Sequence, residues 1–320
     1  MDEHNCEHVS SRGILKSCTF HSPNPRSSCN SDIQYLVDML QSNRMSNGMS
    51  IYVCSDLLRL FVTKVVPRIR HSFVLVSGDS DITVPYEAMT EQDTNRLLNN
   101  PLLIHWYAQN LICHHFQKVL PMPIGLDFHT IASNPNFAWR QSNEPSSPVE
   151  QERILKGIRA KSQPFDQRNM KILVNFTMNN DRFGQRKAAL TVIPNELLCV
   201  SQEFMPRTVL WNKMTEHAFV LSPFGMGMDC HRTWEALCLG CIPIVQTNAL
   251  SELFDGLPVL VVDDWSQITP QLLTDTIDKF ASFAYDKLKL EYWTNTVNAR
   301  ILESAVTKST VSISGNKNIV

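Results

Sequence analysis

The sequence predicts an α/β protein built from two halves of comparable size. Short apolar stretches with strand character alternate with helical stretches along the chain, a pattern typical of parallel sheets covered by helices. The alternation is interrupted once, over residues 130–167, by a stretch rich in Pro, Ser and Asn that is typical of an interdomain connection. A length of 320 residues also fits two domains better than one. A cleft between two such halves is the place where we expect a ligand.

The composition excludes several classes of protein. With 29 basic and 31 acidic residues the net charge is -2, which favours neither nucleic acid nor an anionic membrane as a partner. No apolar stretch approaches the roughly 20 residues of a membrane span. The first 30 residues have neither the basic nor the apolar region of a secretory signal, so we expect a soluble, cytoplasmic protein.

The cysteines fit the same compartment. Their number, nine, is odd, and they are scattered over both halves, which favours reduced thiols. Cys238 and Cys241 form a lone C-x-x-C, which we interpret as two buried structural thiols because no second pair accompanies it. The adjacent His114 and His115 are expected to be partly buried helix residues, since neighbours on a helix point in different directions.

We divide the chain into an irregular N-terminal segment, 1–31, a first domain with the start of the linker, 32–150, and a second domain, 151–320. The first domain is expected to contain helices over 33–40, 57–66 and 86–98, and strands around Ile51, over 73–78, from Leu102 and up to Gly125. For the rest of the chain we expect helices over 149–160, 229–239 and within 272–292, and strands over 171–177, 218–223, 241–246 and 258–264.

The strongest local signal lies in residues 222–245. Gly225 and Gly227 fall between a strand end and a helix start, where glycine permits positive φ and close approach to a ligand. Asp229 is a candidate N-cap, and the free N–H groups of such a helix favour a diphosphate. Arg232 can add a contact to phosphate, while Glu235 can accept hydrogen bonds from sugar hydroxyls. The alternative is a plain glycine-containing turn followed by a surface Arg–Glu pair.

Four segments together resemble a known family, the exostosin-like glycosyltransferases, and in particular their short soluble viral and microbial members. These segments are FVLSPFGMGMDCHRTWEALCLGCIPIV with the DDW that follows it, ILVNFTMNNDRFGQR, HWYAQN and LPMPIGLDFHT. The similarity spans roughly residues 102–265 and does not extend to the first 50. It implies a GT-B-like fold, in which two Rossmann-like domains face each other across a cleft.

The activity that the resemblance implies is inverting transfer of a sugar from a nucleotide-sugar donor, expected to be a UDP-sugar, to a hydroxyl of a glycan or glycoprotein. The first domain would take the acceptor and the second the donor. The donor-binding candidates are Arg182, Arg186, Gly225, Gly227, His231, Arg232 and Glu235. The arginines and the helix N-terminus would stabilise the leaving diphosphate, so no cofactor and no divalent metal is expected.

Inverting transfer needs a general base, and the best candidates are Asp79 and Asp81, in the SGDSD that follows the strand over 73–78. Asp127 and His105 are weaker candidates. The alternative for the two aspartates is an Asx-type turn that ends the strand.

Trp106 and Gln109 are candidates for acceptor binding, because aromatic faces stack on sugars, with core packing as the alternative. For the whole chain the alternative function is a catalytically inactive sugar- or nucleotide-binding protein of the same fold. A third option is a hydrolase of similar shape, such as a relative of the nucleotide-sugar epimerases.

Overall fold

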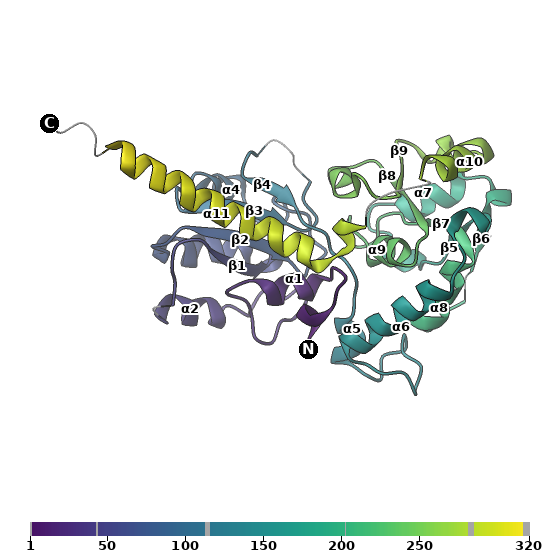
Figure 1. Ribbon diagram of the computed structural model, residues 1–320, viewed down its shortest axis with the longest axis horizontal. Coiled ribbons are helices and arrows are strands. Elements are labelled where there is room, and N and C mark those ends of the chain that lie inside the picture. Colours follow the sequence, from purple (N-terminus) through teal and green to yellow (C-terminus); the bar gives the residue numbers. More distant parts are fainter. Residues whose placement is uncertain (1, 43, 113–115, 202, 281–284, 316–320) are drawn as a thin grey trace. The chain divides into compact units, whose positions relative to one another are not determined.

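The computed structural model describes residues 2–42, 44–112, 116–201, 203–280 and 285–315, with side chains of the final helix described through residue 304. The chain forms two compact units, each containing one wholly parallel sheet with helices, which confirms the predicted α/β class (Figure 1). We call them the strand-β2 unit, Ile14–Met122 with Glu291–Val320, and the strand-β7 unit, Met1–Gly13 with Pro123–Leu290.

The two units differ from the predicted division into 1–31, 32–150 and 151–320. The N-terminal residues Met1–Gly13 belong to the strand-β7 unit, and the C-terminal residues Glu291–Val320 belong to the strand-β2 unit. In the strand-β7 unit, Val9 donates its N–H to the Leu288 carbonyl and accepts from Leu126, both at 2.8 Å. In the strand-β2 unit, the Tyr107 hydroxyl donates to the Thr296 carbonyl at 3.3 Å. These memberships depend on hydrogen bonds between residues far apart in the sequence, which leave no mark on local composition.

The strand-β2 unit has a four-stranded sheet in the simple order β1-β2-β3-β4. All four strands lie at predicted places: β1 Met49–Cys54, β2 Phe73–Gly78, β3 Leu103–Ala108 and β4 Val119–Pro121. The helices are α1 Ser11–Ser17, which begins in the other unit, α2 Gln34–Gln41, α3 Leu58–Leu60, α4 Glu91–Leu98 and α11 Leu290–Gly315. Helix α1 contradicts the prediction of an irregular segment over 1–31, and its residues Ile14 and Leu15 are buried. The helix expected over 57–66 is a chain of short 3-10, α and π turns.

The strand-β7 unit has a five-stranded sheet in the order β6-β5-β7-β8-β9. Its strands are β5 Asn169–Val174, β6 Leu198–Val200, β7 His217–Leu221, β8 Ile242–Gln246 and β9 Leu260–Val262. Its helices are α5 His129–Ser133, α6 Pro148–Lys161, α7 Gln185–Val192, α8 Arg207–Thr215, α9 His231–Cys238 and α10 Pro270–Lys279. The predicted strands and the helices α6, α9 and α10 are confirmed, whereas β6, α5, α7 and α8 were not predicted.

Strand order identifies where the strand-β7 unit should bind a ligand. Branched and aromatic side chains such as Ile172, Phe219 and Ile244 are fully buried and form its core. The chain leaves β5 for β6 on one side and then returns to β7 on the other side. The loops after β5 and β7 therefore diverge, and open α/β sheets bind ligands outside the carboxyl ends of the strands at such a switch point. The simple strand order of the other sheet contains no switch of this kind among its described strands.

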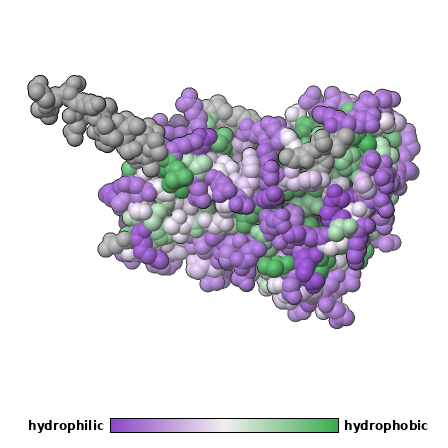
Figure 2. Space-filling view, in the orientation of Figure 1, coloured by the Kyte–Doolittle hydropathy of each residue, from purple (hydrophilic) through white to green (hydrophobic). Residues whose placement is uncertain are grey.

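Hydrophilic residues cover most of the face shown in Figure 2, and hydrophobic residues lie there in separate groups. Among the described residues, no helix is both long and apolar enough to cross a bilayer.

The eight described cysteines are free thiols, and Cys238 and Cys241 are both buried, as predicted. The Cys241 sulfur accepts a hydrogen bond from Arg168 Nη1 at 3.2 Å.

Candidate active site

The predicted donor residues gather at the switch point of the strand-β7 unit. The loop after β5 carries Phe176 and leads into helix α7, while the loop after β7 leads into helix α9. The Arg186 and Arg232 guanidinium carbons lie over the Phe176 ring, 5.3 and 5.4 Å from its centroid. Two cations from different helices therefore share one aromatic platform at the edge where strand order predicts a ligand.

Backbone carbonyls hold the two arginines in place. Arg186 donates from Nε to the Phe224 carbonyl at 3.1 Å and from Nη1 to the Thr177 carbonyl. Arg232 donates from Nε to the Asn175 carbonyl at 3.2 Å. Neutral carbonyls fix the geometry without cancelling the charge, and no ion pair to either arginine is found in the described part of the chain. Burial lowers the pKa of both guanidiniums from a value so high that they remain cationic at neutral pH.

Asp181, which acts electrostatically on Arg186, serves the backbone. Asp181 accepts the N–H groups of Arg186 and Lys187, each at 2.9 Å, and so caps the start of α7. Its charge still acts on Arg186 and partly offsets it. Glu235 acts on Arg232 in the same way, although its carboxylate also holds Trp211 and Arg207. Each carboxylate is thus shared with other protein groups, and the two guanidiniums keep part of their charge for a ligand.

Helix α9 begins without a side-chain cap. Its N-cap residue is Cys230, which makes no capping hydrogen bond, and its first turn contains no acidic residue. The prediction that Asp229 is the N-cap is wrong. Its buried carboxylate instead accepts hydrogen bonds from Trp234 Nε1 at 2.9 and 3.0 Å and from the Ile124 N–H at 2.7 Å. Burial raises the pKa of Asp229 to about 6. The positive end of the α9 dipole is therefore left to other anions.

A glycine at position 225 leaves room for the Arg186 guanidinium, and its backbone angles are not of the kind that favour glycine. A Cβ at this position would lie 2.6 Å from Arg186 Nη2. Its N–H donates to the Gly227 carbonyl at 3.0 Å, which closes the loop. Positive φ occurs in this unit at Gly125, Gly184, Gly240 and Gly256, whereas Gly225 and Gly227 do not use the freedom that glycine offers.

Glu235 is engaged by protein groups. It is 9% exposed, and its Oε1 accepts from Trp211 Nε1 at 3.1 Å and lies 3.8 Å from Arg207 Nε. Arg207 also pairs with Asp127 Oδ2 at 3.2 Å and is itself buried. The sequence analysis missed Arg207, because the stretch RTVLWNKMT of α8 contains no motif. Its buried ion pairs tie α8 to α9 and to the segment after residue 123.

Asp127 is a poor proton acceptor. Burial alone would raise its pKa, but His129, 3.2 Å away, and Arg207 hold it well below the usual value. Its Oδ1 also accepts the Thr130 N–H at 2.9 Å. The structure therefore disfavours Asp127 as the general base.

The remaining donor candidates are His231, which is partly exposed, and Arg182. His231 donates from Nδ1 to the Gly125 carbonyl at 2.7 Å, and its ring lies edge-on to that of His129 at 6.3 Å. Arg182 is exposed, reaches the Met226 carbonyl from Nη1 at 3.5 Å and stacks over Phe183. Of the two arginines predicted from the loop after β5, Arg186 belongs to the cluster over Phe176, whereas Arg182 contacts Met226 and Phe183.

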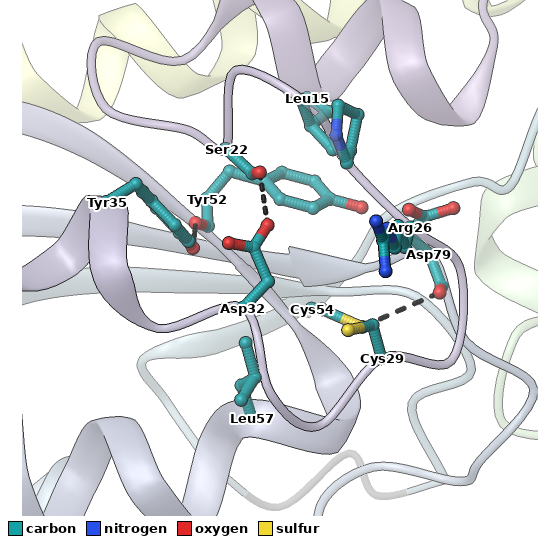
Figure 3. A pocket seen from close by; sticks show the side chains of 11 residues that line it. Leu15, Ser22, Arg26, Cys29, Asp32, Tyr35, Tyr52, Cys54, Leu57 and Asp79 are labelled. Carbon is teal, nitrogen blue, oxygen red and sulfur yellow. Dashed lines mark hydrogen bonds between the residues drawn. The ribbon is translucent and has the colours of Figure 1, made fainter.

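Asp79 and Asp81 lie in the other unit, after β2. Asp79 is 5% exposed with φ of 56°, and its Oδ1 accepts from the Ser27 hydroxyl at 2.7 Å. It lines a pocket in which the Cys54 thiol donates to its carbonyl and the Tyr52 ring points its hydroxyl toward it (Figure 3). The free space there is small, on the order of one water molecule. Asp81 is exposed.

The acceptor candidates are buried. Trp106 is fully buried and its indole donates to Ser77 Oγ at 2.9 Å, so it cannot stack on a sugar here. Gln109 is 1% exposed, and its Oε1 accepts the Asp79 N–H at 2.9 Å, which holds the β2 loop. His105 is buried, and burial lowers its pKa to about 4. For Trp106 and Gln109, core packing explains the residues.

His114 and His115, which were predicted to be partly buried helix residues, lie outside the described residues. Within the described ranges, no group of three or more His, Cys, Asp or Glu side chains is arranged to hold a metal ion.

Comparisons with known proteins give fold-level similarity only. No family model and no curated protein matches the chain. Among solved structures, it is similar to an alpha,alpha-trehalose-phosphate synthase (UDP-forming) from Burkholderia vietnamiensis, with 9% identity, coverage of 90% of this chain and 77% of that one, and a TM-score of 0.39.

An alpha,alpha-trehalose 6-phosphate synthase from Burkholderia multivorans gives 11% identity, coverage of 86% and 76%, and a TM-score of 0.41. A structure described as trehalose-6-phosphate from E. coli bound with UDP-2-fluoro glucose gives 12% identity, coverage of 90% of this chain and 77% of that one, and a TM-score of 0.36. These TM-scores are too low to carry an argument, so the functional conclusion depends on strand order and on the arginine cluster.

Proposed function

We propose that this chain is an exostosin-like, GT-B-type glycosyltransferase that moves a sugar from a nucleotide-sugar donor, a UDP-sugar, to a hydroxyl of a glycan. The observation that carries the proposal is the pair Arg186 and Arg232, held over Phe176 at the switch point of the strand-β7 sheet. A diphosphate is the ligand that such a pair, next to an uncapped helix N-terminus, favours most.

The chemistry follows from the charge. As the sugar leaves its donor, negative charge builds up on the diphosphate oxygens. Arg186 and Arg232 are already oriented by carbonyls, so they stabilise this charge without reorganising. In this proposal protein groups stabilise the departing diphosphate, and no divalent metal is expected to be needed.

The acceptor side is proposed on the sequence resemblance. The strand-β2 unit would take the glycan or glycoprotein acceptor, and the transfer would invert the configuration at the sugar carbon. Asp81, exposed after β2, is the better placed of the two predicted bases there, because Asp79 is buried.

The proposal is tested by measuring UDP affinity by calorimetry and UDP release from a panel of UDP- and GDP-sugars, with water and free monosaccharides as acceptors. Arg186→Ala and Arg232→Ala should each weaken UDP binding by about tenfold or more, since a hydrogen bond to a charged group contributes about 1.5–3 kcal/mol. Arg153→Ala, an exposed arginine of α6 in the same unit, should bind UDP normally.

Two results would separate the alternatives. UDP binding without sugar transfer from any donor would favour the catalytically inactive binding protein. Free sugar or an epimer as the sole product would favour the hydrolase or epimerase relative. Failure of the wild-type protein to bind UDP would contradict the proposal altogether.

A further inference from the structure

His231, the first residue of α9, is placed to act as the proton acceptor of the transfer. We propose that its Nε2 takes the proton of the attacking hydroxyl, in place of Asp79 or Asp81. This inference rests on the proposed glycosyltransferase function. The starting observation is the tautomer of the His231 ring.

The tautomer of His231 is set by its contact with Gly125. A carbonyl oxygen can only accept a hydrogen bond, so the 2.7 Å contact requires the proton on Nδ1. In the neutral ring Nε2 then carries the lone pair. No described residue hydrogen-bonds to Nε2, and the side chain is partly exposed, so the basic nitrogen can meet a substrate hydroxyl.

His231 and Arg232 point to different neighbours although they are consecutive. Side chains one residue apart on a helix diverge by about 100°. Arg232 reaches the Asn175 carbonyl and the Phe176 ring, whereas His231 reaches the Gly125 carbonyl and the His129 ring. One helix start thus presents a cation for the leaving diphosphate and a base on a separate side. Inverting displacement needs this separation, because the hydroxyl attacks from the face opposite the leaving group.

Two buried carboxylates lie in the electrostatic environment of His231. Asp127 and Asp229 both interact with its ring through their charges. His129, edge-on to the ring, is itself paired with Asp127. In the proposed step, positive charge would develop on the His231 ring beside these two carboxylates, as it does beside the aspartate of a catalytic triad.

The step balances as a single displacement. The acceptor oxygen forms a bond to the anomeric carbon of the donor sugar, while its proton passes to Nε2 of His231. The bond between that carbon and the diphosphate oxygen breaks, and the diphosphate leaves with the electron pair. Arg186 and Arg232 compensate its charge, and the imidazolium later releases its proton to solvent.

The test compares His231→Asn and His231→Gln with the wild-type protein. Asn can keep a donor toward the Gly125 carbonyl, and Gln can keep a donor at the position of Nε2, but neither can act as a base. If His231 is the base, both variants should lose about 100- to 10,000-fold in kcat, while their Kd for UDP stays within about threefold. The fall of wild-type kcat at acid pH, where the protonated ring accepts no proton, should also disappear.

Three outcomes would overturn the assignment. The first is a kcat within threefold of wild type in His231→Gln. The second is loss of UDP affinity in both variants to the level of Arg232→Ala, which would make His231 a phosphate contact. The third is a large kcat loss in Asp81→Asn or Asp79→Asn with none in His231→Asn.

The controls separate this inference from the proposed function. His4→Asn changes an exposed histidine of the same unit and should match the wild-type protein in kcat and UDP affinity. If the wild-type protein itself neither binds UDP nor releases it from any nucleotide sugar, the proposed function fails and this inference falls with it. Active wild-type protein with active His231 variants overturns only the inference.

Discussion

Arg186 and Arg232 share the ring of Phe176, 5.3 and 5.4 Å from its centroid, although they come from helices α7 and α9. Like charges held so close repel each other, and the electron-rich face of the ring offsets part of that repulsion. Phe176 therefore links the two loops of the switch point through their cations.

Replacing Phe176 with Leu should weaken UDP binding. The substitution keeps an apolar side chain but removes the ring face, worth about 0.5–2 kcal/mol for each cation. We expect Kd for UDP to rise by about fivefold or more, measured by calorimetry. Phe204→Leu, which changes a phenylalanine that is 63% exposed in the same unit, should leave it unchanged. Equal affinities in the two variants would show that the ring has no part in anion binding.

Gly225→Ala should affect the ligand more than the fold. The new methyl group would lie 2.6 Å from Arg186 Nη2, the far end of a flexible side chain that can move away. The guanidinium then leaves its position, and we expect UDP affinity to fall about tenfold, or ~1.4 kcal/mol. Thermal unfolding should change little.

The matched control is Gly157→Ala, in the middle of α6. A Cβ there meets nothing within 4 Å, and the exchange should stabilise the helix by about 0.5–1 kcal/mol without affecting UDP. Unchanged UDP affinity in Gly225→Ala would contradict the reason given for this glycine.

The sequence predicted the fold where the signal was local. The buried run Phe73–Gly78 and the strand that ends before Pro223 needed only apolar, branched residues in short stretches. Strand order was not predictable, because β6, only Leu198–Val200, is too short to show a pattern. Without β6 the switch between β5 and β7 is invisible, although it is the feature that locates the site.

The site was predicted in part for the same reason. Arg232 was found from its place at a helix start and Arg186 from a motif resemblance, but nothing local shows that they meet over Phe176. Asp229 has the spacing of an N-cap, yet a buried indole 2.9 Å away takes its carboxylate instead. Arg207 belongs to no motif, and its partners lie far away in the sequence.

Arg207→Met should destabilise the strand-β7 unit strongly. Arg207 is 6% exposed and pairs with Asp127 at 3.2 Å and with Glu235 at 3.8 Å. Removing it deprives two buried carboxylates of the guanidinium that they share, which costs about 3–5 kcal/mol. The measurement is urea unfolding followed by tryptophan fluorescence, since Trp211 lies in the network. The exposed Arg153→Met should shift the midpoint very little, and an equal shift in both variants would contradict a structural role for the Arg207 pairs.

Asp229→Asn should change how stability depends on pH. Burial raises the pKa of Asp229 from 3.8 to about 6 in the folded protein, so the folded state favours the protonated carboxyl. The stability from this group is fully present below pH 3.8 and is lost as pH rises through 6, by roughly 3 kcal/mol. Asn cannot ionise, so the variant should gain stability relative to wild type between pH 4 and 7.

The gain is measured as the difference between the two urea unfolding free energies at each pH. Asp127 does not interfere, because its lowered pKa makes its contribution change only below the window, where falling pH removes it. Asp275→Asn, at an exposed position on α10, provides the control and should show no such trend. A difference between Asp229→Asn and wild type that stays constant from pH 4 to 7 would mean that Asp229 is ionised throughout. The carboxylate would then already be charged when it accepts from Trp234 and Ile124, and burial would not govern its proton.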